Sequence, residues 1–470
     1  MRKQTKLVAV LSAAALLAIG ASMTSFAAAP RWEEQSGTWV YLDNKGDKVY
    51  DTWKKSGNQY FYLDENGEMA TSRLVETDNE TYYVDANGAK VMNSWISVDN
   101  EDAIEVGGND VSTIWYYMGS TGKAVKATNT SVVVKELTHG TGKAKYLFDG
   151  EGHMLSGWQD DAASTANTYY LGDENEGWAL TGWQYLEPKE NGAEAYDDSK
   201  WFYFDGGKAV KGENSGTKTK FIKGAYYTFN EDGVMKDDWY GVSTPPSASG
   251  ANAYASGSGG LGTGWVYTTE PGNDNSDSHW YYLVNVKSGN KTVARGVPFN
   301  YNGTAGDQAK IIKSKTYLFD SDGIMKTGVQ TLAAIPAIAS DSKALPAGIY
   351  YFNKADGSVK GQMVTGKATV ETDGEKSYYH FQKDGRAYTN KVQDGCLYGA
   401  DGMRINATDG NTYEIIRTAD VIAAKGGIND EIPANVDVIV NSNGRIKQSG
   451  TVKIDDVTYV VNKYVATVKK

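Results

Sequence analysis

The chain has 470 residues and a formal net charge of -11, and it contains 12% aromatic residues, 53 glycines and a single cysteine. The acidic charge argues against nucleic acid or an anionic membrane surface as a partner, because both are themselves densely negative. The one cysteine, Cys396, excludes an internal disulfide and is expected to be a buried small hydrophobe. The aromatic and glycine content favours many short hairpins over one thick aliphatic core.

Residues 1–27 have the pattern of a signal peptide. Arg2, Lys3 and Lys6 precede an apolar run over residues 7–21, and small residues around Ala27 provide a cleavage site. No later run is long and apolar enough for a membrane span, and the sequence has no sortase-type Leu-Pro-x-Thr-Gly ending. We therefore expect a secreted chain that is soluble or held non-covalently at the cell surface.

Residues 60–71, YFYLDENGEMAT, contain the unit that the rest of the chain repeats. An aromatic run of strand formers comes first, an Asn-Gly turn follows, and a short return strand ends the predicted hairpin. The turn glycines Gly46, Gly67 and Gly88 are spaced by 21 residues. Side-chain alternation makes both faces of the hairpin apolar, so we expect successive copies to stack on one another.

The repeat divides the chain into five predicted segments. These are a signal peptide (1–27), a first repeat array (28–242), a linker or loop rich in Ser, Gly, Pro and Ala (243–263), a second array (264–410) and a small β-rich C-terminal cap (411–470). The last segment replaces the paired aromatics by β-branched residues, which suits a cap on an open array. A short helix is expected at residues 418–425.

Tryptophan marks the junctions between copies. Six tryptophans take this place, three of them after glycine: Trp53, Trp95, Trp158, Trp183, Trp239 and Trp265. The pattern of Gly-Trp, a spacer, aromatic-Tyr-Tyr-x-Asp-x-x-Gly-x-Met and the next Gly-Trp resembles the cell-wall-binding repeat family. That family includes choline-binding modules and is similar to glucan-binding and clostridial-toxin repeats. The resemblance covers residues 39–403 and implies an all-β fold, a β-solenoid of stacked aromatic β-hairpins in one or two arrays.

The resemblance also implies a ligand site. In choline-binding relatives, a quaternary ammonium group lies between hairpins in a cage of aromatic side chains, where cation–π attraction holds it. The best cage implied here consists of Trp158, Tyr169 and Trp183. Two partial sets follow it: Trp183 with Trp201, and Trp265 with Trp280.

Two features count against individual cages. Arg73 takes the place expected for the tryptophan that follows Trp53 and Tyr60, and its charge would repel a cationic ligand. Tryptophan and tyrosine at hairpin junctions also form the core of a thin repeat array, so each of them has a purely structural interpretation as well.

The residues show no arrangement suited to catalysis or to metal binding. The histidines lie far apart, lack zinc-like spacing and are expected at the surface or in loops: His139, His153, His279 and His380. Aspartates at the recurring turns are expected to accept backbone hydrogen bonds, and the acidic residues 274–277 lack the spacing of a calcium loop. We therefore expect no enzyme, no catalytic residue, no metal and no cofactor.

The leading hypothesis is a secreted, non-catalytic bacterial surface protein that binds a cell-wall polymer, either choline-bearing teichoic acid or a similar polymer. An alternative is a glucan- or host-glycan-binding adhesin, or a toxin-type receptor-binding repeat, in which aromatic rings stack on sugars. A third alternative is a structural spacer without a ligand. The oligomeric state is left open.

Overall fold

The computed structural model describes residues 29–161, 167–190, 192, 195–214, 216–244, 248–271, 273, 275–300, 306–338, 342–372, 374–421, 432–433 and 435–470. The predicted signal peptide lies outside these residues, as does part of the acidic stretch 274–277. Within the described ranges, no helix has the length and apolar character needed to cross a membrane.

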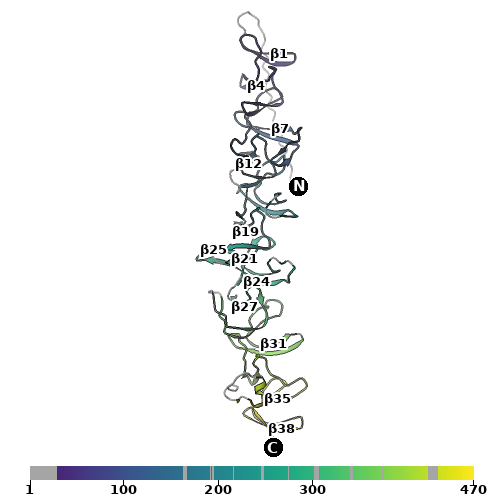
Figure 1. The fold of residues 1–470 in the computed structure, drawn as a ribbon, viewed down its shortest axis with the longest axis vertical. Coiled ribbons are helices and arrows are strands. Elements are labelled where there is room, and N and C mark those ends of the chain that lie inside the picture. Colours follow the sequence, from purple (N-terminus) through teal and green to yellow (C-terminus); the bar gives the residue numbers. More distant parts are fainter. Residues whose placement is uncertain are drawn as a thin grey trace. The chain divides into compact units, whose positions relative to one another are not determined.

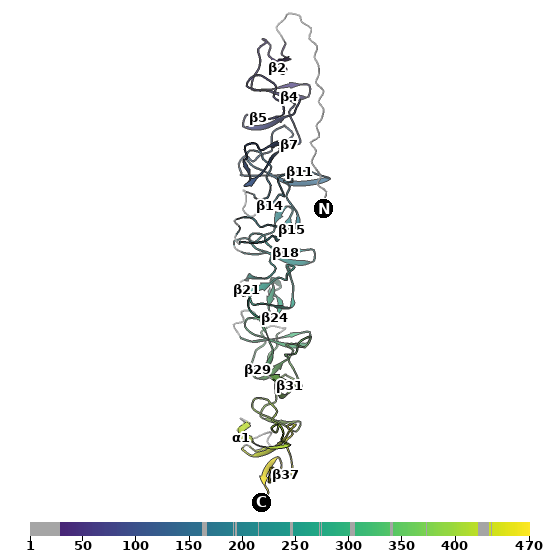
Figure 2. The same cartoon turned by 90° about the vertical axis from the view of Figure 1, so that its right-hand side faces the viewer.

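The chain divides into two compact units. Unit 1 comprises Met1–Ile222 and Tyr227–Met235, and unit 2 comprises Lys223–Tyr226 and Lys236–Lys470. Strands form nearly all of the regular structure, and the one helix of the described ranges, α1, is a single turn at Thr418–Val421. The all-β prediction is therefore confirmed (Figures 1 and 2).

The strands are short and follow one another closely along the chain. Those up to β19 are β1 (Arg31–Gln35), β2 (Thr38–Leu42), β3 (Thr52–Ser56), β4 (Gln59–Leu63), β5 (Arg73–Thr77), β6 (Glu80–Val84), β7 (Ser94–Asp99), β8 (Glu105–Val106), β9 (Asn109–Asp110), β10 (Thr113–Met118), β11 (Val133–His139), β12 (Gly142–Phe148), β13 (Trp158–Asp160), β14 (Thr168–Tyr170), β15 (Gly182–Leu186), β16 (Lys200–Asp205), β17 (Lys208–Ala209), β18 (Lys218–Ile222) and β19 (Ala225–Phe229).

The remaining strands belong to unit 2. They are β20 (Trp239–Thr244), β21 (Ala248–Tyr254), β22 (Gly260–Leu261), β23 (Gly264–Thr268), β24 (His279–Ser288), β25 (Lys291–Pro298), β26 (Gln308–Ile312), β27 (Lys315–Phe319), β28 (Met325–Lys326), β29 (Gly328–Leu332), β30 (Gly348–Phe352), β31 (Gly366–Thr372), β32 (Glu375–Phe381), β33 (Lys391–Gln393), β34 (Cys396–Tyr398), β35 (Tyr413–Arg417), β36 (Asp437–Asn441), β37 (Gly450–Ile454), β38 (Val457–Asn462) and β39 (Val465–Val468).

A typical hairpin pairs a tryptophan strand with the aromatic strand that follows it. β3 pairs with β4 in antiparallel register, so that Trp53 lies opposite Tyr62. The sequence prediction instead paired residues 60–64 with the return segment, residues 68–71. That segment makes only an isolated bridge to the end of its own aromatic strand, at Met69. Its backbone also hydrogen-bonds to the previous hairpin, where the Met69 amide donates to Trp39 O.

An aspartate or asparagine shapes the turn after many of the aromatic strands. Asp64 Oδ1 accepts hydrogen bonds from the amides of Asn66 (2.9 Å) and Glu68 (3.0 Å). Gly67 has a φ of 71°, a left-handed conformation that glycine adopts without strain. The same pair of bonds recurs at Asp43, Asp85, Asp149, Asp320 and Asn441. The structural role predicted for the turn aspartates is therefore confirmed.

Successive hairpins are joined through one residue after each turn. We call it the return residue; it forms a β-bridge with the last residue of its own aromatic strand, as Met69 does with Leu63. Its amide donates to a carbonyl of the previous hairpin: Met69 to Trp39 at 2.7 Å, and Met235 to Trp201 at 2.8 Å. The same contact recurs at Lys90, Ala124, Met154, Met363, Ala387 and Arg404. Hairpins therefore stack in sequence order within each unit, while a solenoid over the whole chain stays a prediction.

The core consists of a series of small aromatic clusters. Phe148, Phe229 and Phe319 end their aromatic strands and are fully buried. Burying one such side chain contributes roughly 1.5–3 kcal/mol, so each hairpin is stabilised mainly where it meets its neighbours. Cys396 is 9% exposed, which confirms the prediction that it is buried.

The stretch 243–263, for which composition predicted a linker or loop, includes β21 and β22. β21 pairs with β20, which places Tyr254 opposite Trp239. Ala253 and Ala255 are fully buried, because their small side chains let the strand approach its neighbours closely. This stretch therefore contributes a hairpin to unit 2, and the five segment boundaries stay predictions.

The last 60 residues form the predicted β-branched strands. β35 pairs with β36, and β37 to β39 form an antiparallel sheet. Val438, Ile439 and Val440 are fully buried. The helix α1 lies within the predicted 418–425, of which residues 422–425 are outside the described residues. The capping role of this segment stays a prediction.

Candidate ligand sites at the hairpin junctions

Each junction tryptophan packs first on a tyrosine of its own hairpin. Trp183 lies opposite Tyr203 and Trp265 opposite Tyr282. Directly opposed residues of an antiparallel pair point to the same face, and the ring centroids are 5.2 and 5.1 Å apart in edge-to-face geometry. The register of the hairpin therefore fixes the orientation of the tryptophan.

The same tryptophan also contacts the aromatic strand of the next hairpin. Trp183 lies 4.8 Å from Tyr227, and Trp265 lies 4.8 Å from Tyr317. The other junction tryptophans repeat this contact: Trp32 with Phe61, Trp53 with Tyr82, Trp95 with Tyr146, Trp158 with Phe202 and Trp239 with Tyr281. Aromatic rings from two consecutive hairpins thus meet at each junction.

Two junctions bring a second tryptophan to the first, as the sequence predicted. Trp183 and Trp201 lie 6.3 Å apart, and Trp265 and Trp280 lie 6.2 Å apart, each pair with an interplanar angle of 85°. Trp201 is 45% exposed and Trp265 is 37% exposed. Each pair is therefore an open corner with two perpendicular aromatic walls.

Other residues complete these two corners. Tyr185 packs on Trp201, and Tyr267 packs on Trp280, both at 5.2 Å. A methionine that pairs with the last residue of its aromatic strand belongs to each cluster: Met235, opposite Phe229, at the unit 1 corner and Met325, opposite Phe319, at the unit 2 corner. A methionine thioether adapts to an aromatic neighbour and adds no charge.

A buried cation lies near the corner in unit 2. Lys310 is 4% exposed, and its Nζ lies 4.5 Å from the Phe299 ring centroid and 6.0 Å from that of Tyr282. Because Tyr282 packs on Trp265, a positive charge already interacts with this aromatic cluster. The corner of Trp183 and Trp201 is therefore the better candidate for a cationic ligand.

The set of Trp158, Tyr169 and Trp183 is not brought together by the ring contacts of the structure. Tyr169 is 1% exposed and lies opposite Gln159, in a cluster with Leu171. Trp158 instead lies opposite Tyr170 and packs on Phe202 and Phe204 of the next hairpin. Side chains alternate along a strand, so a shift of one residue moves a tyrosine to the other face.

The place of Arg73 also differs from the prediction. Leu74 lies opposite Tyr83, as Trp53 lies opposite Tyr62, so Leu74 and not Arg73 holds the tryptophan place of β5. Arg73 Nη2 lies 3.2 Å from an oxygen of Asp64 in an exposed ion pair. The place predicted for Arg73 is therefore wrong, and its repulsion of a cationic ligand stays a prediction.

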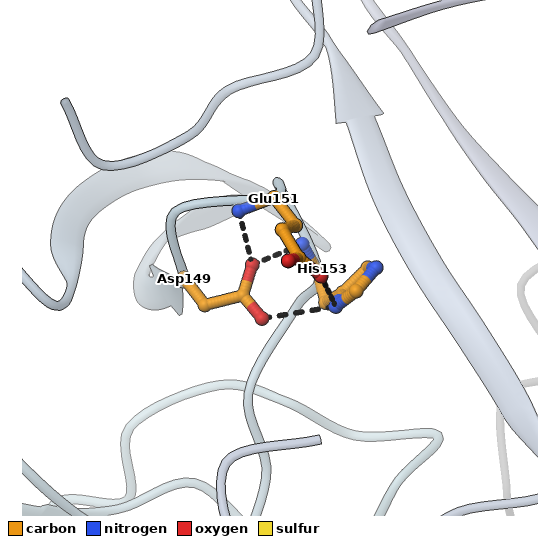
Figure 3. A group of neighbouring side chains, drawn as sticks. All are labelled: Asp149, Glu151 and His153. Atoms are coloured by element: carbon orange, nitrogen blue, oxygen red, sulfur yellow. Dashed lines mark hydrogen bonds and ion pairs between the residues drawn. The ribbon is translucent and has the colours of Figure 1, made fainter. Parts of the chain in front are cut away.

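Three potential metal ligands converge at the turn after β12, as Figure 3 shows. Ligand atoms of Asp149, Glu151 and His153 all lie within 4.8 Å of one another. Asp149 Oδ1 accepts bonds from the amides of Glu151 (2.9 Å) and His153 (2.8 Å), and Oδ2 lies 2.9 Å from His153 Nδ1. His153 is 6% exposed and lies in the turn, so it is a buried loop histidine, and its predicted loop position is confirmed.

Hydrogen bonds and burial act in opposite directions on Asp149. Burial raises the pKa of this carboxyl, but the His153 side chain and the two backbone amides outweigh it and lower the pKa overall. The oxygens that would bind a metal ion already hold the turn together. We therefore assign the cluster to the fold, and the expected absence of a metal stays a prediction.

Two consecutive hairpins, β3–β4 and β5–β6, match a known family profile. Residues 52–95 match the choline-binding repeat. This match confirms the resemblance to choline-binding repeats predicted from the sequence, and it spans the junction of Trp53 with Tyr82. The choline-binding repeat of residues 52–95 has the same junction geometry as the hairpins that contain Trp183 and Trp265.

Several solved structures are similar to the chain. Choline binding protein F from Streptococcus pneumoniae has 18% identity and a TM-score of 0.30, over 81% of this chain and 100% of that chain. The modular autolysin LytC from Streptococcus pneumoniae, in complex with a synthetic peptidoglycan ligand, has 15% identity and a TM-score of 0.35, over 78% of this chain and 56% of that chain. CbpJ from Streptococcus pneumoniae has 18% identity and a TM-score of 0.29, over 80% of this chain and 100% of that chain. No curated protein matches.

Sequence reasoning missed the aromatic and methionine residues that the next hairpin contributes. These are Tyr227 with Met235 in unit 1, and Tyr317 with Met325 in unit 2. Both methionines lie five residues after a turn asparagine or aspartate, a spacing that is visible in the sequence. What the sequence lacks is the bridge that carries the return residue onto the previous hairpin.

Proposed function

We propose that the chain is a secreted, non-catalytic surface protein that binds choline groups of a bacterial cell-wall polymer at its hairpin junctions. The observation that supports this function is the perpendicular tryptophan corner, formed by Trp183 with Trp201 and again by Trp265 with Trp280. The choline-binding repeat of residues 52–95 supports the choice of ligand class. Export through residues 1–27 belongs to the same proposal.

The chemistry of the corner suits a quaternary ammonium group. A cation within about 6 Å of a ring centroid is attracted by the quadrupole of the ring, and tryptophan is the strongest partner. The two rings lie at 85° to each other, so cation–π attraction from both would act on a compact quaternary ammonium group in the corner. The exposure of Trp201, 45%, leaves this corner accessible from solvent.

A glycan ligand is the second candidate, because two tyrosines beside the corners are strongly exposed. Tyr185 is 56% exposed and Tyr267 is 58% exposed, and a flat exposed ring suits stacking on the apolar face of a sugar. A spacer without a ligand would bind neither class. Choline and glycan binding are distinguished by the variants that abolish them.

The test is equilibrium dialysis of the mature chain against radiolabelled choline. We expect Trp201→Ala and Trp280→Ala each to remove one bound equivalent of choline, and the double variant to remove two. Tyr50→Ala is the control, since Tyr50 is a 53% exposed aromatic residue outside both corners. Unchanged choline binding in the double variant would overturn the proposal.

Two further measurements separate the alternatives. Binding of dextran or another glycan that is lost in Tyr185→Ala and Tyr267→Ala, without choline binding, would establish the glycan function instead. Release of soluble fragments from purified cell wall by the mature chain would overturn the non-catalytic assignment. We expect no fragment release and elution of wall-bound protein by free choline.

A further inference from the structure

The junction of Trp53 contains a cation supplied by the chain itself. Lys90 Nζ lies 5.0 Å from the ring centroid of Trp53, 4.6 Å from that of Tyr60 and 5.4 Å from that of Tyr82. Trp53 and Tyr60 belong to the β3–β4 hairpin, and Tyr82 belongs to the next one. The ammonium group is thus in contact range of three rings from two hairpins.

Lys90 holds the place that methionine holds elsewhere. It is the return residue of its hairpin, since it bridges to Val84 and its amide donates to Tyr60 O at 2.8 Å. Met235 makes the equivalent bond to Trp201 O at the same distance of 2.8 Å. Tyr60 and Trp201 therefore correspond, and the Trp53 junction matches the Trp183 corner with lysine in place of Met235 and tyrosine in place of Trp201.

A glycine of the following hairpin covers the stem of this lysine. A Cβ on Gly122 would lie 2.9 Å from Lys90 Cδ, and a Cβ on Gly88 would lie 2.8 Å from the Met69 sulfur. Turn glycines thus pack on the return residue in both places. The Lys90 stem is confined in the space that a methionine side chain fills at another junction.

The rings are the attractive partners of the Lys90 ammonium. Across the described ranges Lys90 takes part in no ion pair, and burial together with the like charge of Lys123 lowers its pKa. Lys123 itself is paired with Glu80 at 2.9 Å. A lysine held without a carboxylate partner is best explained by cation–π attraction to the three rings.

A second return residue shows the same behaviour. Arg404 donates its amide to Tyr378 O at 2.7 Å, and its guanidinium carbon lies 4.3 Å from the centroid of the Tyr378 ring. A cationic return residue therefore lies over an aromatic ring of the previous hairpin in unit 2 as well as in unit 1.

We propose that Lys90 is the resident cation of the aromatic site formed by Trp53, Tyr60 and Tyr82, and that it excludes external quaternary ammonium groups from this site. Lys90 is thus a specificity-determining residue, because it closes a junction that a methionine would leave open. The identity of the external ligand rests on the proposed function, whereas the occupancy of the site by Lys90 does not.

The binding test compares three chains by equilibrium dialysis with choline. Lys90→Met is expected to bind one more equivalent of choline than the wild type, because it places methionine at the return position, as at the Trp183 corner, and leaves the rings of Trp53, Tyr60 and Tyr82 without a resident cation. Lys90→Arg keeps a cation in the site and is expected to bind the wild-type number. An unchanged number in Lys90→Met, with choline still bound elsewhere, would overturn the inference.

A second readout needs no choline binding at all. Amine acetylation followed by peptide mass spectrometry should label Lys90 several-fold more slowly than the exposed turn residue Lys45. Tyr60→Ala removes one wall of the site and should raise the labelling rate of Lys90 without changing that of Lys45. Equal rates for both lysines in the wild type would overturn the inference even if the proposed function fails.

Discussion

Each junction tryptophan couples two hairpins through contacts of different origin. Trp183 meets Tyr203 across its own hairpin at 5.2 Å and Tyr227 of the next hairpin at 4.8 Å. An aromatic pair of this kind contributes about 0.5–1.5 kcal/mol beyond its buried area. We therefore expect changes at Trp183 to act on stability and, under the proposed function, changes at the exposed ring of Trp201 to act on ligand binding.

Asp149 offers a prediction about pH. The hydrogen bonds of the turn lower the pKa of the Asp149 carboxyl in the folded chain relative to the ordinary carboxyl value. The unfolded-state pKa is about 3.9. The contribution of Asp149 to stability is therefore present above that pH, and it is lost as the pH falls through the lower folded-state pKa. Asp149→Asn keeps the turn acceptor, as Asn230 does with the amide of Val234 at 2.8 Å. We expect the variant to lose stability at pH 6 and to approach the wild type below about pH 3.

Urea unfolding at a series of pH values measures this difference. The matched control is Asp47→Asn, because Asp47 is an exposed turn carboxylate of the same unit. A difference between wild type and Asp149→Asn that stays constant from pH 6 to low pH would show that the ion pair with His153 does not carry the effect.

Single residues show how far the sequence leads. The pairs Trp183 with Trp201 and Trp265 with Trp280 were predictable, because the resemblance to choline-binding repeats implied them and the structure brings their rings together. Tyr169 was not predictable as a buried residue, since adjacent tyrosines differ only in the face they occupy. That choice depends on the register of Gln159 and Tyr169, which paired strands fix only in three dimensions.

The hairpin is held to its neighbours by the return residue and by the glycine that covers it. Met69 makes the backbone bond to the previous hairpin, and Gly88, in the turn of the following hairpin, packs against the methionine side chain. Glycine is favoured at this position for two reasons: its φ is +77°, and a Cβ would lie 2.8 Å from Met69 Sδ. Turn chemistry and stacking are therefore coupled in one residue.

This coupling predicts different costs for two equivalent glycines. Gly46→Ala meets no atom within 4 Å and should lose only the roughly 1–2 kcal/mol of left-handed backbone strain. Gly88→Ala should lose about 1 kcal/mol more, because the new methyl group must displace Met69. The measurement is the urea unfolding midpoint of each variant. Adding Met69→Ala to Gly88→Ala should reduce the extra loss, and equal losses for the two single variants would contradict this account.

Element type followed from local sequence, and element pairing did not. The alternation of aromatic residues and the Asp-x-x-Gly turns predict strands and turns where the structure has them. The partner of the aromatic strand was expected after the turn, but it lies before it, at Trp53 and its neighbours. The return segment does not form a full strand with the aromatic strand, because its return residue donates its amide to a carbonyl of the previous hairpin. No local sequence pattern encodes this contact between hairpins.

Across the whole chain, the aromatic repeat spreads equivalent junctions over both units. Unit 1 contains the Trp183 corner and unit 2 contains the Trp265 corner. Under the proposed function each unit supplies one choline site, and a second contact of the same chain with a polymer that presents many choline groups would form at a high effective concentration. The repeat itself was predictable from the spacing of glycine and tryptophan, whereas the number of open junctions depends on return residues such as Lys90.

Two corners on one chain predict that retention depends on ligand density. On a surface with dense choline groups, the wild type should dissociate at least about tenfold more slowly than Trp201→Ala or Trp280→Ala, because each variant keeps a single corner. On a sparse surface the three chains should dissociate at similar rates, since no second group lies within reach. Surface plasmon resonance over a range of choline densities measures both limits. Equal dissociation rates for the wild type and the single variants on the dense surface would mean that the two corners do not bind at the same time. Retention of the protein on a cell wall would then depend on the affinity of a single corner.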